Sequence, residues 1–131
     1  MECLVVTLTH HLQRVQNSAA RLVTGASKYA HISPVLELLH WLPVEFRPQY
    51  KILIYTFKAI QNAGPIYLNK LVTPYQPKRC LRSSTEALIV VPKSNTVTYG
   101  NRCFTFKAAT LWNSLPLTLR NAKTLCTLRK T

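Results

Sequence analysis

Hydrophobic residues recur near the start of the chain at alternating steps of four and three. These positions are Leu8, Leu12, Val15, Ala19 and Leu22. The spacing places all five on one face of an amphipathic helix. Gly25 follows the last of them, and glycine is favoured just past a helix C-terminus. The pattern therefore predicts a first helix that ends at Gly25 and buries this apolar face.

Prolines separate the next two predicted helices. Ser33 can serve as the N-cap and Pro34 as the first residue of a short helix over residues 34–40. Pro43 ends this helix, because the residue before a proline is pushed out of the α region, and it can also begin the following helix. That third helix ends shortly before Pro65. Its predicted buried stripe is Tyr50, Leu53, Ile54, Phe57 and Ile60.

Two short runs rich in β-branched residues follow in the second half. ALIVVPK (87–93) and NTVTYG (95–100) predict one short β-hairpin. Asn101 can then cap a helix, and Pro116 begins a last short helix. The predicted fold is mostly α, a small α+β fold of four to five short helices with one short β-hairpin in the second half.

The 131 residues amount to about one domain. We expect residues 1–11 to form an atypical N-terminal start and residues 12–62 a helical part. Residues 63–86 are a basic connector containing Pro and Ser, and residues 87–131 hold the hairpin and its helices. A single domain over residues 1–131 is therefore predicted.

The dipeptide Leu-Pro occurs in two similar stretches, LHWLPVEFR (39–47) and LWNSLPLTLR (111–120). Trp41 directly precedes the first Leu-Pro pair, and Trp112 stands three residues ahead of the second. We expect each indole to fill the corner between two helices and to donate its N–H to a carbonyl freed at the helix end. Each proline is predicted to lie at a helix start. The residues expected to have structural roles are Trp41, Pro43, Gly100, Trp112 and Pro116.

Positive charge is concentrated in the second half. The chain carries 17 Lys and Arg, four Glu and no Asp, a formal net charge of +13. Residues 1–65 hold six Lys and Arg and three Glu (+3), whereas residues 66–131 hold eleven and one (+10). This excess predicts a polyanion, RNA or DNA, as the partner of the C-terminal half.

The few acidic residues argue against catalysis. Two-metal phosphoryl transfer and glycosidic cleavage both need converging carboxylates, and the four glutamates are dispersed along the chain. The four cysteines form no Cys-x-x-Cys pair, so we expect buried, reduced thiols and no metal or cofactor. No apolar run reaches the roughly 20 residues of a membrane span, and the N-terminus lacks the basic start of a signal peptide. We therefore expect a non-enzymatic, intracellular chain, cytoplasmic or nuclear, with no membrane partner.

Basic residues line the outer face of the first helix, one flank of the third helix and a loop rich in Pro and Ser, where they are densest. Such positions suit contacts to a nucleic-acid backbone without base readout, although ordinary solvated side chains fit the same pattern. On the last long helix, an aromatic side chain beside an arginine could stack on a base or pack against the hairpin. The candidate nucleic-acid-binding residues are Arg14, Arg21, Arg47, Lys51, Lys58, Lys78, Arg79, Arg82, Arg102, Phe106 and Lys107.

Eight stretches match a known family in their order and spacing. They are LQRVQNSAARLVT (12–24), LHWLPV (39–44), YKILIYTFKAI (50–60), GPIYL (64–68), LRSS (81–84), VVP (90–92), YGNRCF (99–104) and LWNSLPLTLR (111–120). Together they resemble the segment downstream of the reverse transcriptase domain in jockey-like and related LINE-type non-LTR retrotransposons. The resemblance implies a parent polyprotein with an endonuclease and an RNA-directed DNA polymerase, whose catalytic aspartates lie upstream. It also implies that this chain is a truncated fragment without catalytic residues.

Two interpretations of function stay open at this point. The segment either binds RNA or DNA backbone without sequence preference, or docks as a structural module on a polymerase domain, its charge being incidental. A docking module should expose a large hydrophobic patch. One departure from the family pattern is Pro48, which we expect to break or displace the first turn of the third helix.

Overall fold

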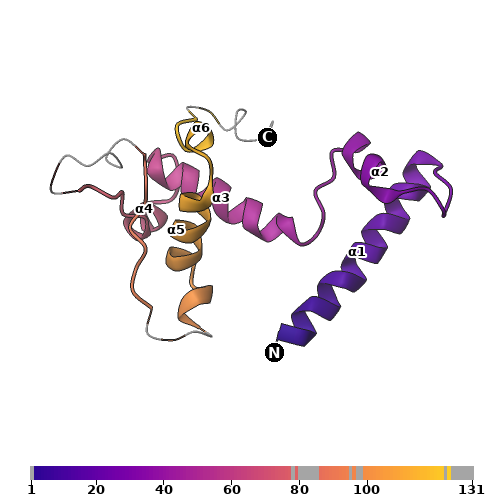
Figure 1. Ribbon diagram of the computed structural model, residues 1–131, viewed down its shortest axis with the longest axis horizontal. Coiled ribbons are helices and arrows are strands. Elements are labelled where there is room, and N and C mark those ends of the chain that lie inside the picture. The colour runs from indigo at the N-terminus through magenta and orange to yellow at the C-terminus, as the bar shows by residue number, and fades with distance from the viewer. Residues whose placement is uncertain are drawn as a thin grey trace. The chain divides into compact units, whose positions relative to one another are not determined.

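The computed structural model describes residues 2–77, 79, 86–94, 96, 99–122 and 124. Contacts divide the chain into two compact units, Met1–Tyr50 and Lys51–Thr131. The boundary falls within helix α3 (Phe46–Ile60), so this helix contributes to both units. Each unit has its own packing (Figure 1).

The first unit is built from helices α1 (Glu2–Thr24) and α2 (Ile32–Leu38), which pack together, and from the link to α3. α1 ends at the predicted place, because Gly25 takes the left-handed conformation with φ of 66° that glycine adopts without strain. Arg21 fastens the following turn by donating from Nη2 to the Ala30 carbonyl at 3.3 Å.

The apolar face of α1 that was predicted to be buried is exposed instead. Its four large side chains expose between 49% and 86% of their surface. From residue 7 onward, the buried residues of α1 are Ala20, with no exposed surface, and Gln16, which is 8% exposed. A small residue such as Ala20 lets a neighbouring helix approach closely, and the spacing of large hydrophobic residues gives no sign of it.

Two glutamines of α1 hold the link between α2 and α3. Gln13 Oε1 accepts the Val44 N–H at 2.8 Å, and Gln16 Nε2 donates to the Leu42 carbonyl at 3.1 Å. Pro43 lies between these two contacts. Its carbonyl accepts the Phe46 N–H at 3.1 Å, so Pro43 stands three residues ahead of α3 and not at its first residue.

Two details of these helices differ from the prediction. α2 begins at Ile32, with His31 as its N-cap, so Ser33 and Pro34 both lie inside its first turn. α3 continues from Phe46 through Pro48 without a break. Proline is tolerated there because the N–H groups of the first turn have no acceptor within the helix.

The second unit packs the end of α3 with α4 (Ile66–Leu71), the 3-10 helix η2 (Gly100–Arg102), α5 (Phe104–Ser114) and α6 (Leu117–Arg120). Among its described residues, those that are buried are Thr56, Phe57, Ala59, Val72, Ile89, Ala108, Ala109 and Trp112. The rings of Phe57 and Trp112 lie 6.4 Å apart at an angle of 45°. Phe57 belongs to the predicted buried stripe of the third helix, whereas Trp112 was singled out by its place ahead of a Leu-Pro pair.

The predicted start of α6 is correct, and the predicted cap of α5 is wrong. Pro116 precedes α6 as predicted, and its carbonyl accepts the N–H groups of Leu119 and Arg120. Asn101 does not cap α5. It lies within η2, and Cys103 is the N-cap residue of α5.

The predicted β-hairpin is wrong, because no β-strand forms in the part of the chain that the structure describes. The fold is therefore mostly helical and not α+β. The first run of the predicted hairpin is extended, but it pairs with a segment after α4: Tyr75 N–H donates to the Leu88 carbonyl at 2.8 Å, and Val90 N–H donates to the Thr73 carbonyl at 3.0 Å.

Side chains of α5 occupy the other edge of this extended segment. Asn113 Oδ1 accepts the Ile89 N–H at 3.0 Å, and Asn113 Nδ2 donates to the Ile89 carbonyl at 2.9 Å. The amide thereby takes the place of a second strand. Trp112, which is 1% exposed, donates from Nε1 to the Ala87 carbonyl at 2.9 Å. The extended segment is thus held by a backbone on one edge and by a helix on the other.

Candidate nucleic-acid interface

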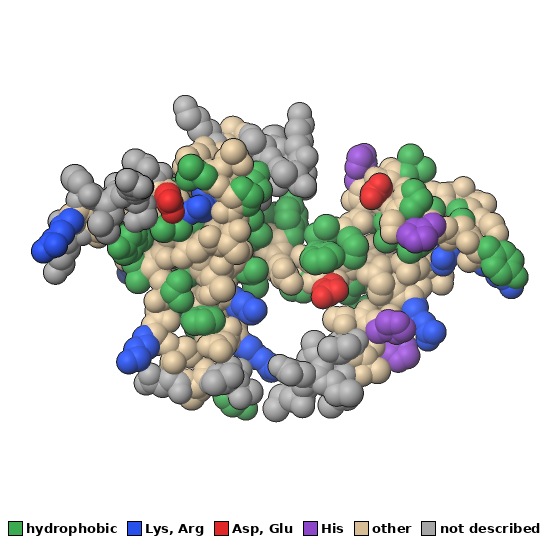
Figure 2. Space-filling model, in the orientation of Figure 1, with side chains coloured by type: hydrophobic (Ala, Val, Ile, Leu, Met, Phe, Trp, Pro, Cys, Tyr) green, Lys and Arg blue, Asp and Glu red, His purple; other side chains and the backbone are tan. Residues whose placement is uncertain are grey.

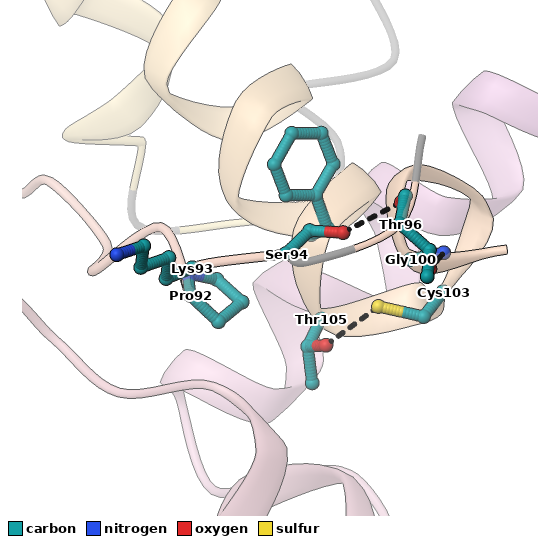
Figure 3. Close-up of a pocket in the computed structure, with 8 residues that line it drawn as sticks. Pro92, Lys93, Ser94, Thr96, Gly100, Cys103 and Thr105 are labelled. Atoms are coloured by element: carbon teal, nitrogen blue, oxygen red, sulfur yellow. Dashed lines mark hydrogen bonds between the residues drawn. The ribbon is translucent and has the colours of Figure 1, made fainter. Parts of the chain in front are cut away.

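A cavity of about 260 Å³ lies at the start of α5 in the second unit. It is lined by Pro92, Lys93, Ser94, Thr96, Gly100, Cys103, Thr105 and Phe106 (Figure 3). Ser94 Oγ donates to the Thr96 carbonyl at 2.8 Å, and Thr96 Oγ1 accepts the Gly100 N–H at 3.0 Å. A Cβ at Gly100 would overlap Ser94 Oγ, so this close approach requires glycine.

Cys103 places a thiol at the N-terminus of α5. Its Sγ lies 3.0 Å from Thr105 Oγ1. The hydrogen bond with Thr105 and the backbone N–H of Phe106 lower the pKa of the Cys103 thiol below its usual value, although the side chain is exposed. The first turn of α5 carries no acidic residue. The positive end of the helix dipole is therefore not neutralised by a neighbouring carboxylate.

Three exposed cations surround this helix start, and we call Lys93, Arg102 and Lys107 the α5 basic cluster. Lys93 lines the cavity, and its ammonium extends away from Cys103 (Figure 3). Arg102 directly precedes Cys103, and Lys107 directly follows the cavity residue Phe106. Lysine, arginine and the N–H groups at a helix start are the usual donors to phosphate oxygens.

Three of the candidate residues from the sequence, Arg102, Phe106 and Lys107, lie in or directly before the first turn of α5, and of these Phe106 lines the cavity. Phe106 is half-buried in the cavity wall. Lys93 was missed, although it ends the ALIVVPK run. The signal that could have identified Lys93 was its place directly before Ser94, between the two runs of the predicted hairpin.

The remaining candidates lie apart from the α5 basic cluster in the sequence, and several have structural contacts. In the first unit Arg21 is half-buried against Ala30, and Arg47 donates from Nε to the Leu42 carbonyl at 3.0 Å. Arg47 is exposed, as are Arg14, Lys51 and Arg79, and Lys58 is half-buried. Lys78 and Arg82 lie outside the described residues.

A second hollow belongs entirely to the first unit. This groove of about 460 Å³ is lined by Leu12, Val15, Gln16, Trp41, Val44 and Arg47. Trp41 is half-buried there, in contrast to the fully buried Trp112. Gln16 Oε1 is buried without a hydrogen-bond partner. The groove is therefore an apolar hollow with a single cation, and it differs in chemistry from the α5 basic cluster.

Neither the described residues nor the comparisons with known proteins point to a metal site, a membrane span or a related protein. Within the described residues, no three His, Cys, Asp or Glu side chains come together in a way that could hold a metal ion. None of the helices in the described part is both long enough and apolar enough to cross a membrane. No protein-family model, curated protein or solved structure matches the chain.

Proposed function

We propose that the chain binds the backbone of RNA or DNA without sequence preference, as a non-catalytic segment of a LINE-type retroelement protein. The observation that carries this proposal is the division of charge between the two units. Lys51–Thr131 contains thirteen Lys and Arg and one Glu, a formal charge of +12, whereas Met1–Tyr50 contains four and three, a charge of +1. A surface with this excess attracts polyphosphates by releasing their bound counterions.

Within the described residues of the second unit, the α5 basic cluster is the part best suited to phosphate. Its three cations are exposed, and no acidic residue stands in the first turn of α5 to compete with a phosphate. Phe106 contributes to the cavity wall and is half-buried, so it does not present an open ring for base stacking. This combination favours recognition of the backbone over recognition of bases.

The proposal includes the absence of polymerase activity, because the chain holds no Asp and only four dispersed Glu. We expect no primer extension when the chain is supplied with primed template, Mg²⁺ or Mn²⁺ and nucleotides. Extension that survives repurification would overturn the assignment. A function on nucleic acid belongs to the cytoplasm or nucleus.

Binding is tested with a matched pair of double variants. Arg102→Ala with Lys107→Ala removes two exposed charges of the α5 basic cluster, and Lys28→Ala with Lys70→Ala removes two exposed charges that are not among the candidate residues. Affinities for unrelated single-stranded and duplex oligonucleotides are measured by fluorescence anisotropy over a range of salt concentrations. The cluster variant should lower the slope of log K against log salt by about 1.4–1.8, and the control variant should leave the slope unchanged. Equal slopes for all three proteins, or strong preference for one sequence, would refute the proposal.

A second candidate function is docking on a polymerase domain, and α4 provides a specific observation for it. Ile66, Tyr67 and Leu71 on this short helix expose between 45% and 75% of their surface. Exposed apolar groups of this kind mark protein contacts when they gather on one element. Replacing Ile66 and Tyr67 with Gln should weaken association with a retroelement polymerase domain in a titration, while leaving oligonucleotide binding unchanged.

A further inference from the structure

The exposed face of α1 has the spacing of a coiled-coil seam. Its residues Leu8, Leu12, Val15, Ala19 and Leu22 alternate in steps of four and three, which is an average repeat of 3.5 residues. Leu12 and Ala19 take the a positions of a heptad, and the other three take the d positions. Such a seam is suited to contact with a second helix that winds around it.

α2 does not cover this seam. From residue 7 onward, the residues of α1 that are buried are Gln16 and Ala20, which lie to one side of the a and d positions, while Leu22 remains 86% exposed. Figure 2 shows hydrophobic side chains (green) at the surface of the molecule. α1 thus has one side that packs within its own unit and a second apolar side that is available to a partner.

The charge of the first unit points to a second copy of this chain as that partner. The unit carries a net charge of only +1, in contrast to +12 for the second unit. The e and g positions beside the seam hold His11 and Ser18 on one side and Thr9, Gln16 and Val23 on the other, with no Lys, Arg, Asp or Glu among them. Two copies of α1 can therefore approach without like charges meeting beside the seam.

The exposed area fits a reversible dimer. The large apolar residues on this side are Leu8, Leu12, Val15, Leu22 and Val23. A Leu or Val side chain offers roughly 100 Å² of apolar surface, so five that are about two-thirds exposed contribute roughly 600 Å² from two copies together. Because interfaces are only about 60% apolar, the whole contact would cover roughly 1,000 Å². This lies just below the standard size for stable complexes, so we expect a weak, reversible dimer with a dissociation constant on the order of 10–100 µM.

The groove beside the seam enlarges this surface. Trp41 and Val44 line it together with the seam residues Leu12 and Val15. Side chains of a partner helix on the seam can enter it, and they would cover the half-buried indole. We propose that the chain forms a homodimer through the α1 seams of two copies, independently of nucleic-acid binding by the second unit.

Sedimentation equilibrium of the full chain tests this proposal, at concentrations from about 5 to about 500 µM, which bracket the expected constant. Wild type should shift from monomer to dimer within this range. Because the seam is uncharged, the constant should change less than threefold, as an order of magnitude, between about 0.1 and 1 M salt. Oligonucleotide affinity should fall steeply over the same salt range, so failure of the dimer and failure of nucleic-acid binding are distinguishable.

Two seam variants act in opposite directions. Val15→Gln with Leu22→Gln should weaken the dimer by at least about tenfold, whereas Ala19→Leu, which fills a small exposed a position, should tighten it by about tenfold. The matched control is Tyr29→Gln with Leu38→Gln, which removes two exposed apolar side chains of the same unit away from the seam. A wild type that stays monomeric throughout, or a control that weakens the dimer as much as the seam variant, would overturn the proposal.

Discussion

Replacing Asn113 with Ala tests whether a side-chain amide substitutes for a strand in the second unit. The variant loses two hydrogen bonds, at 3.0 and 2.9 Å, to the backbone of Ile89. Ile89 is 5% exposed, so water reaches its freed N–H and carbonyl poorly. Each buried backbone group left without a partner costs about 1–3 kcal/mol, and partial access for water in the space left by the side chain reduces the sum. We expect a loss of about 2–4 kcal/mol in the free energy of unfolding.

Urea unfolding followed by tryptophan fluorescence measures this loss. A Trp41→Phe background leaves Trp112 as the sole tryptophan, so the signal reports on the second unit. With an m-value of about 1–3 kcal/mol per M, the midpoint should fall by about 1–2 M. The control is Thr110→Ala on the same helix, whose exposed hydroxyl bonds only to the Phe106 carbonyl one turn earlier. This control should change stability by less than about 0.5 kcal/mol.

Hydrogen exchange adds a local measurement. The Ile89 amide should exchange much faster in Asn113→Ala than in wild type, because its acceptor is removed. The reasoning fails if Asn113→Ala loses no more stability than Thr110→Ala, or if the Ile89 amide keeps its protection in the variant.

Two further predictions concern the same unit. Trp112→Phe keeps a ring near Phe57 but loses the bond from Nε1 to Ala87, so it should cost about 1–3 kcal/mol in urea unfolding, against less than about 0.5 kcal/mol for Trp41→Phe. Thr105→Val should raise the pKa of Cys103, because it removes the first cause of the lowered value. Wild-type Cys103 should therefore be alkylated by iodoacetamide at lower pH than the variant, as measured by peptide-resolved mass spectrometry, and identical pH profiles would contradict this account.

Helices were predictable from this sequence because their signals are local. The apolar spacing around Phe57, the capping signal before residue 104 and the prolines between helices predicted α3, α5 and α6 close to their observed places. The β-hairpin was wrong for a different reason. A β-branched run predicts an extended backbone, which residues 87–91 have, but the partner of that backbone is a long-range property. Here the partners are residues 73–75 and the amide of Asn113.

The candidate site was predictable to the extent that charge and sequence neighbours define it. Arg102, Phe106 and Lys107 stand near one another in the chain, and the structure keeps them at the start of α5. Lys93 lies ten residues before Cys103 in the chain, and the structure places both in the lining of one cavity. The buried face of α1 could not be found in this way, because an amphipathic pattern identifies an apolar side without identifying what covers it.

The two Leu-Pro stretches show how one motif acquires two roles. In the second unit Asn113 follows Trp112. Trp112 forms a hydrogen bond with the backbone of Ala87 and Asn113 with that of Ile89, and the indole is fully buried in the core. In the first unit Leu42 follows Trp41. A leucine side chain cannot form hydrogen bonds to the backbone. The link between α2 and α3 is held instead by two glutamines of α1, which form hydrogen bonds with the backbone of Leu42 and Val44. Trp41 is thereby left half-buried in a groove beside the α1 seam, where a second copy of the chain would complete its burial.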